Sequence, residues 1–211
     1  MTSNALRAGD RILFQGDSIT DANRLASPEL GDGYVAMVAG VMQAMRPDLA
    51  LRVLNRGVSG DRSAELLERW KRDCIDLKPD VVSIMVGVND VWRLAGEWNG
   101  QTHISLPPFR MNYVRLLDQV STAGVRQVFL VSPTTITHEN ASPLNDLLGE
   151  YDDAVRDLAR QYGAVYVPAR EALLAARTAQ PEVAWTTDGC HPGTAGHALI
   201  AACWLRAAAV L

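Results

Sequence analysis

Five short, continuously apolar runs recur along the chain and alternate with segments of helical periodicity. The runs cover residues 11–15, 51–55, 81–86, 127–131 and 164–167. They are rich in Val, Ile and Leu without regular polar alternation, which is typical of strands buried on both faces of a parallel sheet. Apolar residues at helical spacing predict helices over residues 34–45, 63–77, 109–123, 143–162, 170–179 and 193–210. The alternation predicts βαβ crossovers and therefore a doubly wound, three-layer α/β sandwich.

A chain of 211 residues without internal repeats or linkers predicts a single domain over residues 1–211. Residues 92–108 form the one long irregular segment, which we expect to line or cover a pocket. The formal net charge is -4 and no run of Lys or Arg forms a basic stripe, so we expect no nucleic-acid partner.

Neither a membrane span nor an export signal is expected. The longest apolar stretch, residues 198–205, is far shorter than a membrane span. The first residues lack the apolar core of a signal peptide. The three cysteines, Cys74, Cys190 and Cys203, are an odd and sparse set, which fits a reducing compartment. We therefore expect a cytoplasmic protein.

Four short segments carry residues typical of chemistry rather than of packing. They are GDSIT at 16–20, NRGVSGD at 55–61, GVND at 87–90 and DGCHP at 188–192. The first three directly follow the first three predicted strands, and ligands in open α/β sheets bind beyond the carboxyl ends of the strands. Together they offer a hydroxyl nucleophile, donors for an oxyanion, and a base with a nearby carboxylate.

Ser18 and His191 are the candidate nucleophile and base. Ser18 leads a strand-to-helix turn, where its own amide can face a developing negative charge; its alternative role is a helix N-cap. His191 can accept a proton near neutral pH, and Asp188, three residues earlier, can orient the ring. The alternative for this pair is a surface Asx-turn. Cys190 is a weaker nucleophile candidate.

Gly60 and Asn89 are the candidate oxyanion donors. Gly60 can offer a backbone N–H without a Cβ to obstruct close approach, and Asn89 can offer its side-chain amide. Their alternative roles are an ordinary loop glycine and an Asx-turn.

No metal or cofactor is expected. The histidines lack metal-ligand spacing, no Cys-x-x-Cys occurs, and no G-x-G-x-x-G follows the first strand. A carboxylate cluster for glycoside cleavage or magnesium is disfavoured because it leaves the serine, the asparagine and the histidine without a role. That cluster would comprise Asp17, Asp21, Asp90 and Asp188.

The four segments resemble the SGNH (GDSL-type) hydrolases, which take their name from residues at the positions of Ser18, Gly60, Asn89 and His191. The resemblance implies that Ser18 is the nucleophile and that its amide, Gly60 and Asn89 form the oxyanion hole. It implies that Asp188 and His191 complete a triad. It also implies a flavodoxin-like α/β/α sandwich with a five-stranded parallel sheet.

A narrower likeness is to intracellular bacterial acetylxylan esterases, which deacetylate short xylo-oligosaccharides. It rests on segments 33–35, 55–60, 78–80 and 87–93. It implies that Trp92 helps wall a small acyl pocket, and it makes a homo-oligomer an expectation. One departure is that Trp185 is separated from Asp188 by two threonines. Asp17, Trp92 and Trp185 are predicted to contact substrate; core or interface packing is the alternative for the two tryptophans.

The predicted function is hydrolysis of short-chain acyl esters, acetyl esters above all, on xylo-oligosaccharides or related sugars. The first alternative is a lysophospholipase or thioesterase that uses the same triad on longer acyl chains. The second, from another class, is a non-catalytic carbohydrate-binding module. It is disfavoured because no triad or oxyanion position is missing.

Overall fold

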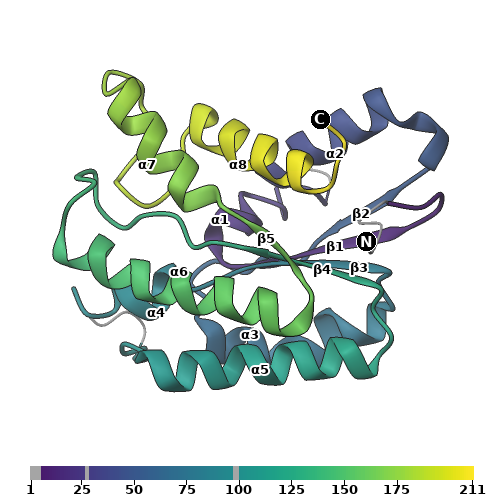
Figure 1. Cartoon of the computed structure of the whole chain (residues 1–211), viewed down its shortest axis with the longest axis horizontal. Helices are drawn as coiled ribbons and strands as arrows, with labels where there is room; N and C mark the ends of the chain where they lie inside the picture. Colours follow the sequence, from purple (N-terminus) through teal and green to yellow (C-terminus); the bar gives the residue numbers. More distant parts are fainter. Residues whose placement is uncertain (1–5, 27–28, 97–99) are drawn as a thin grey trace.

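All five predicted strands form one parallel sheet. The computed structural model describes residues 6–26, 29–96 and 100–211. The strands run in the order β2-β1-β3-β4-β5 (Figure 1). Their bounds are β1 (Arg11–Gly16), β2 (Arg52–Asn55), β3 (Val81–Met85), β4 (Gln127–Val131) and β5 (Val165–Val167). This order reverses direction beside β1, which places a ligand-binding crevice at the carboxyl ends of β1 and β3.

Helices cover both faces of the sheet, so the predicted three-layer sandwich is confirmed (Figure 1). One layer holds α2 (Tyr34–Met45), α7 (Ala169–Ala179) and α8 (Thr194–Ala207). The other holds α3 (Ser63–Asp73), α5 (Leu106–Thr122) and α6 (Pro143–Tyr162). Two short helices, α1 (Ser18–Asp21) and α4 (Val88–Trp92), follow β1 and β3. No helix in the described part of the chain is long and apolar enough to cross a membrane.

Three predicted helix ends need correction, and one of them is that of α8, which ends at Ala207 and not at residue 210. The segment 63–77 is not one helix, because α3 ends at Asp73 and a separate 3-10 turn, Ile75–Leu77, follows. Helix α5 begins at Leu106, inside the segment predicted to be irregular, with its prolines in the first turn. Proline has no N–H to donate, and the first turn of a helix needs none, so these prolines start the helix instead of excluding it. Residues 97–99 of that segment lie outside the described residues.

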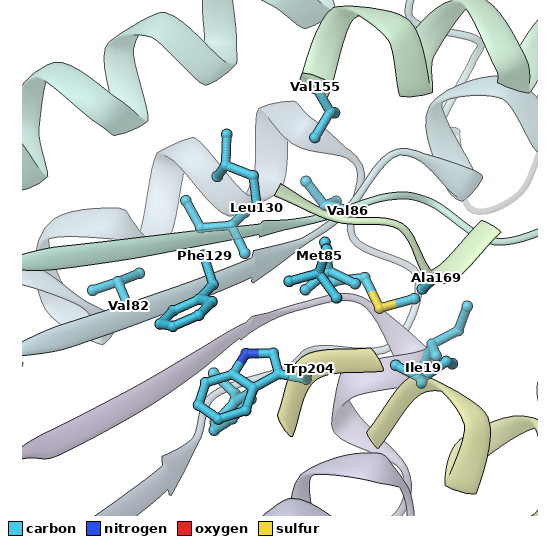
Figure 2. Packing of buried hydrophobic residues seen from close by; sticks show 14 of the residues in the cluster. Ile19, Val82, Met85, Val86, Phe129, Leu130, Val155, Ala169 and Trp204 are labelled. Carbon is cyan, nitrogen blue, oxygen red and sulfur yellow. The ribbon is translucent and has the colours of Figure 1, made fainter. Parts of the chain in front are cut away.

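The core between the sheet and α8 is built around Trp204. Its ring centroid lies 5.1 Å from that of Phe14 on β1 and 4.7 Å from that of Phe129 on β4. Figure 2 shows Trp204 beside Phe129, with Ile19 in the same hydrophobic cluster. Ile19 is buried and directly follows Ser18 in α1. The predicted nucleophile therefore stands on a turn whose next side chain is held in the core.

Candidate active site

Ser18 occupies the first position of α1, and the preceding residue caps that helix. The Asp17 carboxylate accepts a hydrogen bond from the backbone N–H of Ile19 at 3.0 Å. The capping role that Ser18 could have taken therefore belongs to Asp17. A first-turn N–H has no acceptor within its own helix, which leaves the Ser18 amide available to a ligand. Gly16 allows the tight turn, because a Cβ there would lie 2.2 Å from the Met85 carbonyl oxygen.

Hydrogen bonds connect Ser18 to Asp188 through the His191 ring. The Ser18 hydroxyl lies 2.9 Å from Nε2 of His191, and Nδ1 of the same ring lies 2.7 Å from Oδ2 of Asp188. The other carboxylate oxygen, Oδ1, accepts the backbone N–H groups of Cys190 and His191. Partial burial alone would raise the pKa of Asp188. The hydrogen bonds from His191 and the backbone outweigh burial and hold that pKa below its usual value.

Gly60 and Asn89 lie at the same cavity as the serine and the histidine. The cavity has a volume of about 470 Å³ and is lined by Ser18, Ser59, Gly60, Asn89, Trp92, Arg93, Ala95, Gly96 and His191. Gly60 has φ +87°, a left-handed conformation that favours glycine. No described residue accepts a backbone hydrogen bond from its N–H. Asn89 is buried and donates one amide hydrogen to the Asp61 carbonyl at 3.0 Å, so its second hydrogen is available.

The three residues predicted to contact substrate lie in different places in the structure. Trp92 lines the cavity, and its ring centroid lies 5.8 Å from that of His191. Trp185 lines a different pocket and donates its indole N–H to the Gln180 carbonyl at 3.0 Å. Asp17 is 1% exposed and is engaged as the cap of α1. The structure thus brings Trp92 to the cavity but not Asp17 or Trp185.

The carboxyl groups near the site serve local structure. Burial raises the pKa values of Asp17 and Asp90 to about 7. Asp90 accepts hydrogen bonds from the backbone N–H and the hydroxyl of Ser63, at the start of α3. In the described residues, no group of three or more His, Cys, Asp or Glu side chains could hold a metal ion. Burial also raises the pKa of the Cys190 thiol well above its usual value, which keeps it protonated.

Arg177 on α7 contacts the loop that carries Asp188 and His191, a contact that the sequence analysis did not predict. Its guanidinium donates to the Thr186 hydroxyl at 2.8 Å and to the Gly189 carbonyl at 3.2 Å. It also donates to the Thr137 carbonyl at 2.9 Å, which joins that loop to the one after β4. In the sequence, an arginine on a helix indicates only a solvated face, so no pattern could have identified this contact.

Comparison with known proteins places these residues in a family. The model of the GDSL-like lipase/acylhydrolase family matches residues 14–199, a span that includes all four motifs of the site. The chain belongs to this family. The match agrees with the SGNH resemblance of the motifs and with the five-stranded α/β fold.

Three of the most similar matches are acetylxylan esterases of Geobacillus. An acetylxylan esterase from Geobacillus stearothermophilus is 35% identical over 207 residues, which covers 94% of each chain. A crystal structure of the Geobacillus acetylxylan esterase matches with a TM-score of 0.86 and 34% identity, over 96% of this chain and 95% of that one. A variant of it with tryptophan replaced by isoleucine, described as an acetyl-xylooligosaccharide esterase, matches with a TM-score of 0.88 over the same shares at 34% identity.

Membership in the GDSL-like family and the likeness to an esterase identify the chain as a carboxylic ester hydrolase. This decides against the non-catalytic carbohydrate-binding module that the sequence left open.

Proposed function

We propose that the protein is a serine esterase that removes acetyl groups from xylo-oligosaccharides or related sugars. The observation that carries the proposal is the unbroken hydrogen-bond path from the Ser18 hydroxyl through His191 to Asp188, beside a cavity. The Geobacillus relative supports it further. Its solved structures include catalytic mutants in which a serine, an aspartate or a histidine is replaced by alanine. The mutated aspartate and histidine are three positions apart in that chain. Asp188 and His191 have the same spacing.

The first step is acylation of Ser18. His191 Nε2 accepts the hydroxyl proton as the serine oxygen attacks the ester carbonyl. Asp188 stays ionised, holds the proton of the ring on Nδ1 and stabilises the imidazolium. The N–H groups of Ser18 and Gly60 and the Asn89 amide stabilise the tetrahedral oxyanion, and each such donor typically contributes ~10²–10³ in rate.

The second step regenerates the enzyme. His191 gives its proton to the leaving sugar oxygen, so that the sugar departs as an alcohol. Water then attacks the acetyl-serine with His191 again as base, and acetate leaves as the Ser18 hydroxyl re-forms. Every transferred proton passes through the His191 imidazole, so the ring must contact the serine. The carboxylate keeps the ring in the orientation that allows this.

Trp92 is proposed to limit the length of the acyl group. Its ring lies beside the His191 ring in the cavity lining, which also includes Ala95 and Gly96. A wall of this kind suits an acetyl group. A lysophospholipase or thioesterase would need to accommodate a long acyl chain there, and this alternative is an outcome of the test below. The contacts with substrate predicted for Asp17 and Trp185 stay predictions.

We also propose a cytoplasmic location and a homo-oligomeric state. The cysteines support the former, because all three are buried as free thiols. The likeness to acetylxylan esterases supports the latter. Cell fractionation and size-exclusion chromatography test them separately.

The test is a panel of esters with a matched pair of serine variants. Acetylated xylo-oligosaccharides, phenyl acetate, a long-chain nitrophenyl ester and a lysophospholipid are compared by kcat/KM. Ser18→Ala should lower kcat by about 10³-fold or more on every substrate that is turned over, because it removes the nucleophile. Ser121→Ala, an exposed serine on α5, should leave the rates unchanged.

Two results would contradict the proposal. Full activity in Ser18→Ala would remove the triad, and a preference for the long-chain esters would decide for the lysophospholipase or thioesterase. A fluorophosphonate probe followed by mass spectrometry gives an independent check, since the adduct should lie on Ser18.

A further inference from the structure

A second cavity, of about 580 Å³, opens at the same Ser18–His191 pair. It shares Ser18, Ser59 and His191 with the first cavity and none of the other lining residues. The character of the two linings differs. The first cavity holds Trp92 and the oxyanion donors, whereas the second is lined by polar side chains from the loop after α1 and from the start of α8. They are Asn23, Asp32, Thr194 and His197.

The His197 ring has a fixed tautomer. Its Nδ1 atom accepts the backbone N–H of Tyr34 at 3.2 Å, so that nitrogen carries no proton. Burial lowers the pKa of His197 below its usual value, which favours the neutral ring. In the neutral ring the proton therefore lies on Nε2, and the group that His197 can offer to the cavity is a hydrogen-bond donor.

Asp32 supplies the opposite polarity. It accepts a hydrogen bond from the Asn23 side chain at 2.9 Å through one of its two carboxylate oxygens, and it is exposed at the cavity. The Thr194 hydroxyl can both donate and accept. The lining thus mixes a carboxylate acceptor, an imidazole donor and a hydroxyl within one cavity.

An acyl chain in this cavity would leave these polar groups without partners, which is costly. An anionic group would meet the Asp32 carboxylate. Sugar hydroxyls both donate and accept, so a neutral polyhydroxylated group can satisfy the whole lining.

We propose that the second cavity binds the alcohol half of the ester, a neutral sugar, and that Asp32, Thr194 and His197 select it by hydrogen bonds. This inference rests on the proposed function. It assigns the two arms of the ester to two sides of the nucleophile. The acetyl group and the carbonyl oxygen lie towards Trp92, Gly60 and Asn89. The sugar oxygen lies towards the second cavity, and His191, which lines both cavities, gives that oxygen its proton.

The test compares two acetyl esters that differ only in the alcohol. Asp32→Ala and Thr194→Val are assayed on an acetylated xylo-oligosaccharide and on phenyl acetate, whose alcohol has no hydroxyl group beyond the ester oxygen. Each substitution should lower kcat/KM for the acetylated xylo-oligosaccharide, relative to kcat/KM for phenyl acetate, by about tenfold, because a hydrogen bond to a sugar hydroxyl is lost. Asp48→Ala removes an exposed carboxylate that pairs with Arg46 and lines neither cavity, so it is the matched control and should leave the ratio unchanged.

The outcomes separate this inference from the proposed function. An unchanged ratio in both variants, or a wild-type enzyme that turns over phenyl acetate but no acetylated sugar, overturns the sugar site while the serine mechanism stands. Activity that survives Ser18→Ala overturns the proposed function itself. Folding is monitored by the phenyl acetate rate, so a variant that loses its structure loses both activities and is distinguished from one that loses sugar binding. If the variants lose their structure, the wild-type enzyme is tested for competitive inhibition by the deacetylated oligosaccharide. Inhibition supports the sugar site, and no inhibition up to the solubility limit of the sugar overturns it.

Discussion

Replacing Asp17 by asparagine measures how strongly burial destabilises a charged carboxylate next to Ser18. Asp17 is buried, and burial raises its pKa from the ordinary 3.8 to about 7, although the Ile19 N–H and the nearby His191 act in the opposite direction. In the unfolded chain the carboxyl ionises at its ordinary pKa. Between the two pKa values the folded protein holds a proton that the unfolded chain has released. Stability contributed by this group is therefore lost as the pH rises through that window.

The magnitude follows from the difference between the two pKa values. They differ by about 3, and each pKa unit corresponds to about 1.4 kcal/mol, so the wild-type protein should lose about 4 kcal/mol of unfolding free energy between about pH 4 and pH 7 through this group. Asparagine cannot ionise but still caps a helix N-terminus as well as aspartate does. The variant should therefore gain about 4 kcal/mol relative to the wild type across the same window. Asp90 is present in both proteins, so its own titration largely cancels in the comparison.

Equilibrium urea unfolding followed by tryptophan fluorescence, repeated from pH 4 to pH 8 at constant ionic strength, gives the two stability curves. The prediction concerns their difference, which should grow with pH and become constant above about pH 7. Curves that stay parallel over the whole range would show that Asp17 does not titrate abnormally, and the reasoning from burial would be refuted.

Two further predictions concern the loop that carries Asp188 and His191. Asp188→Asn should lower kcat by about 10³–10⁴-fold because the ring of His191 loses the acceptor that fixes its tautomer; a rate within tenfold of the wild type would contradict the role of Asp188. Arg177→Ala should lower kcat by about 10- to 100-fold with little change in KM, since the loop after Thr186 loses its support, and Arg177→Lys should restore part of the rate. No change in kcat, a fall in kcat matched by an equal fall in the folded fraction, or no rescue by lysine would show that Arg177 serves stability alone.

The fold was predictable because its signals are local and consistent. The continuous apolar runs marked strands buried on both faces, and β4 covers the residues expected for it. Helices α2 and α6 likewise have the predicted bounds. The boundaries that failed depend on weaker effects. The predicted helix began at residue 109, after the two prolines, although the first turn of a helix tolerates proline and α5 begins at Leu106.

The candidate site was predictable only in part, because side-chain contacts are not written in a motif. Spacing suggested that Asp188 can reach His191, and the structure shows the contact. Spacing could not show that Trp185 turns to the Gln180 carbonyl, away from the cavity, or that the Asp17 carboxyl is buried as a cap. Arg177 was hidden for the same reason, since its acceptors come from loops distant in the sequence.

Hydrogen bonds from two polar side chains explain how the first two motifs come to share one site. Asn55, at the end of β2, donates to the carbonyl groups of Thr20 and Leu30 at 2.6 and 2.9 Å and accepts the Gly57 N–H at 2.9 Å. It therefore ties the loop that carries Gly60 to the turn that carries Ser18.

Arg69 on α3 makes a second tie between the same two loops. Its guanidinium donates to the carbonyl groups of Gly16 and Arg56 and to the carboxylate of Asp61, and this ion pair is largely buried. In the proposed mechanism these loops supply the amides of Ser18 and Gly60 to one oxyanion, and the two ties fix both loops before substrate arrives. Donors that are already in place need no reorganisation as charge develops, which is the condition under which such dipoles contribute most to catalysis.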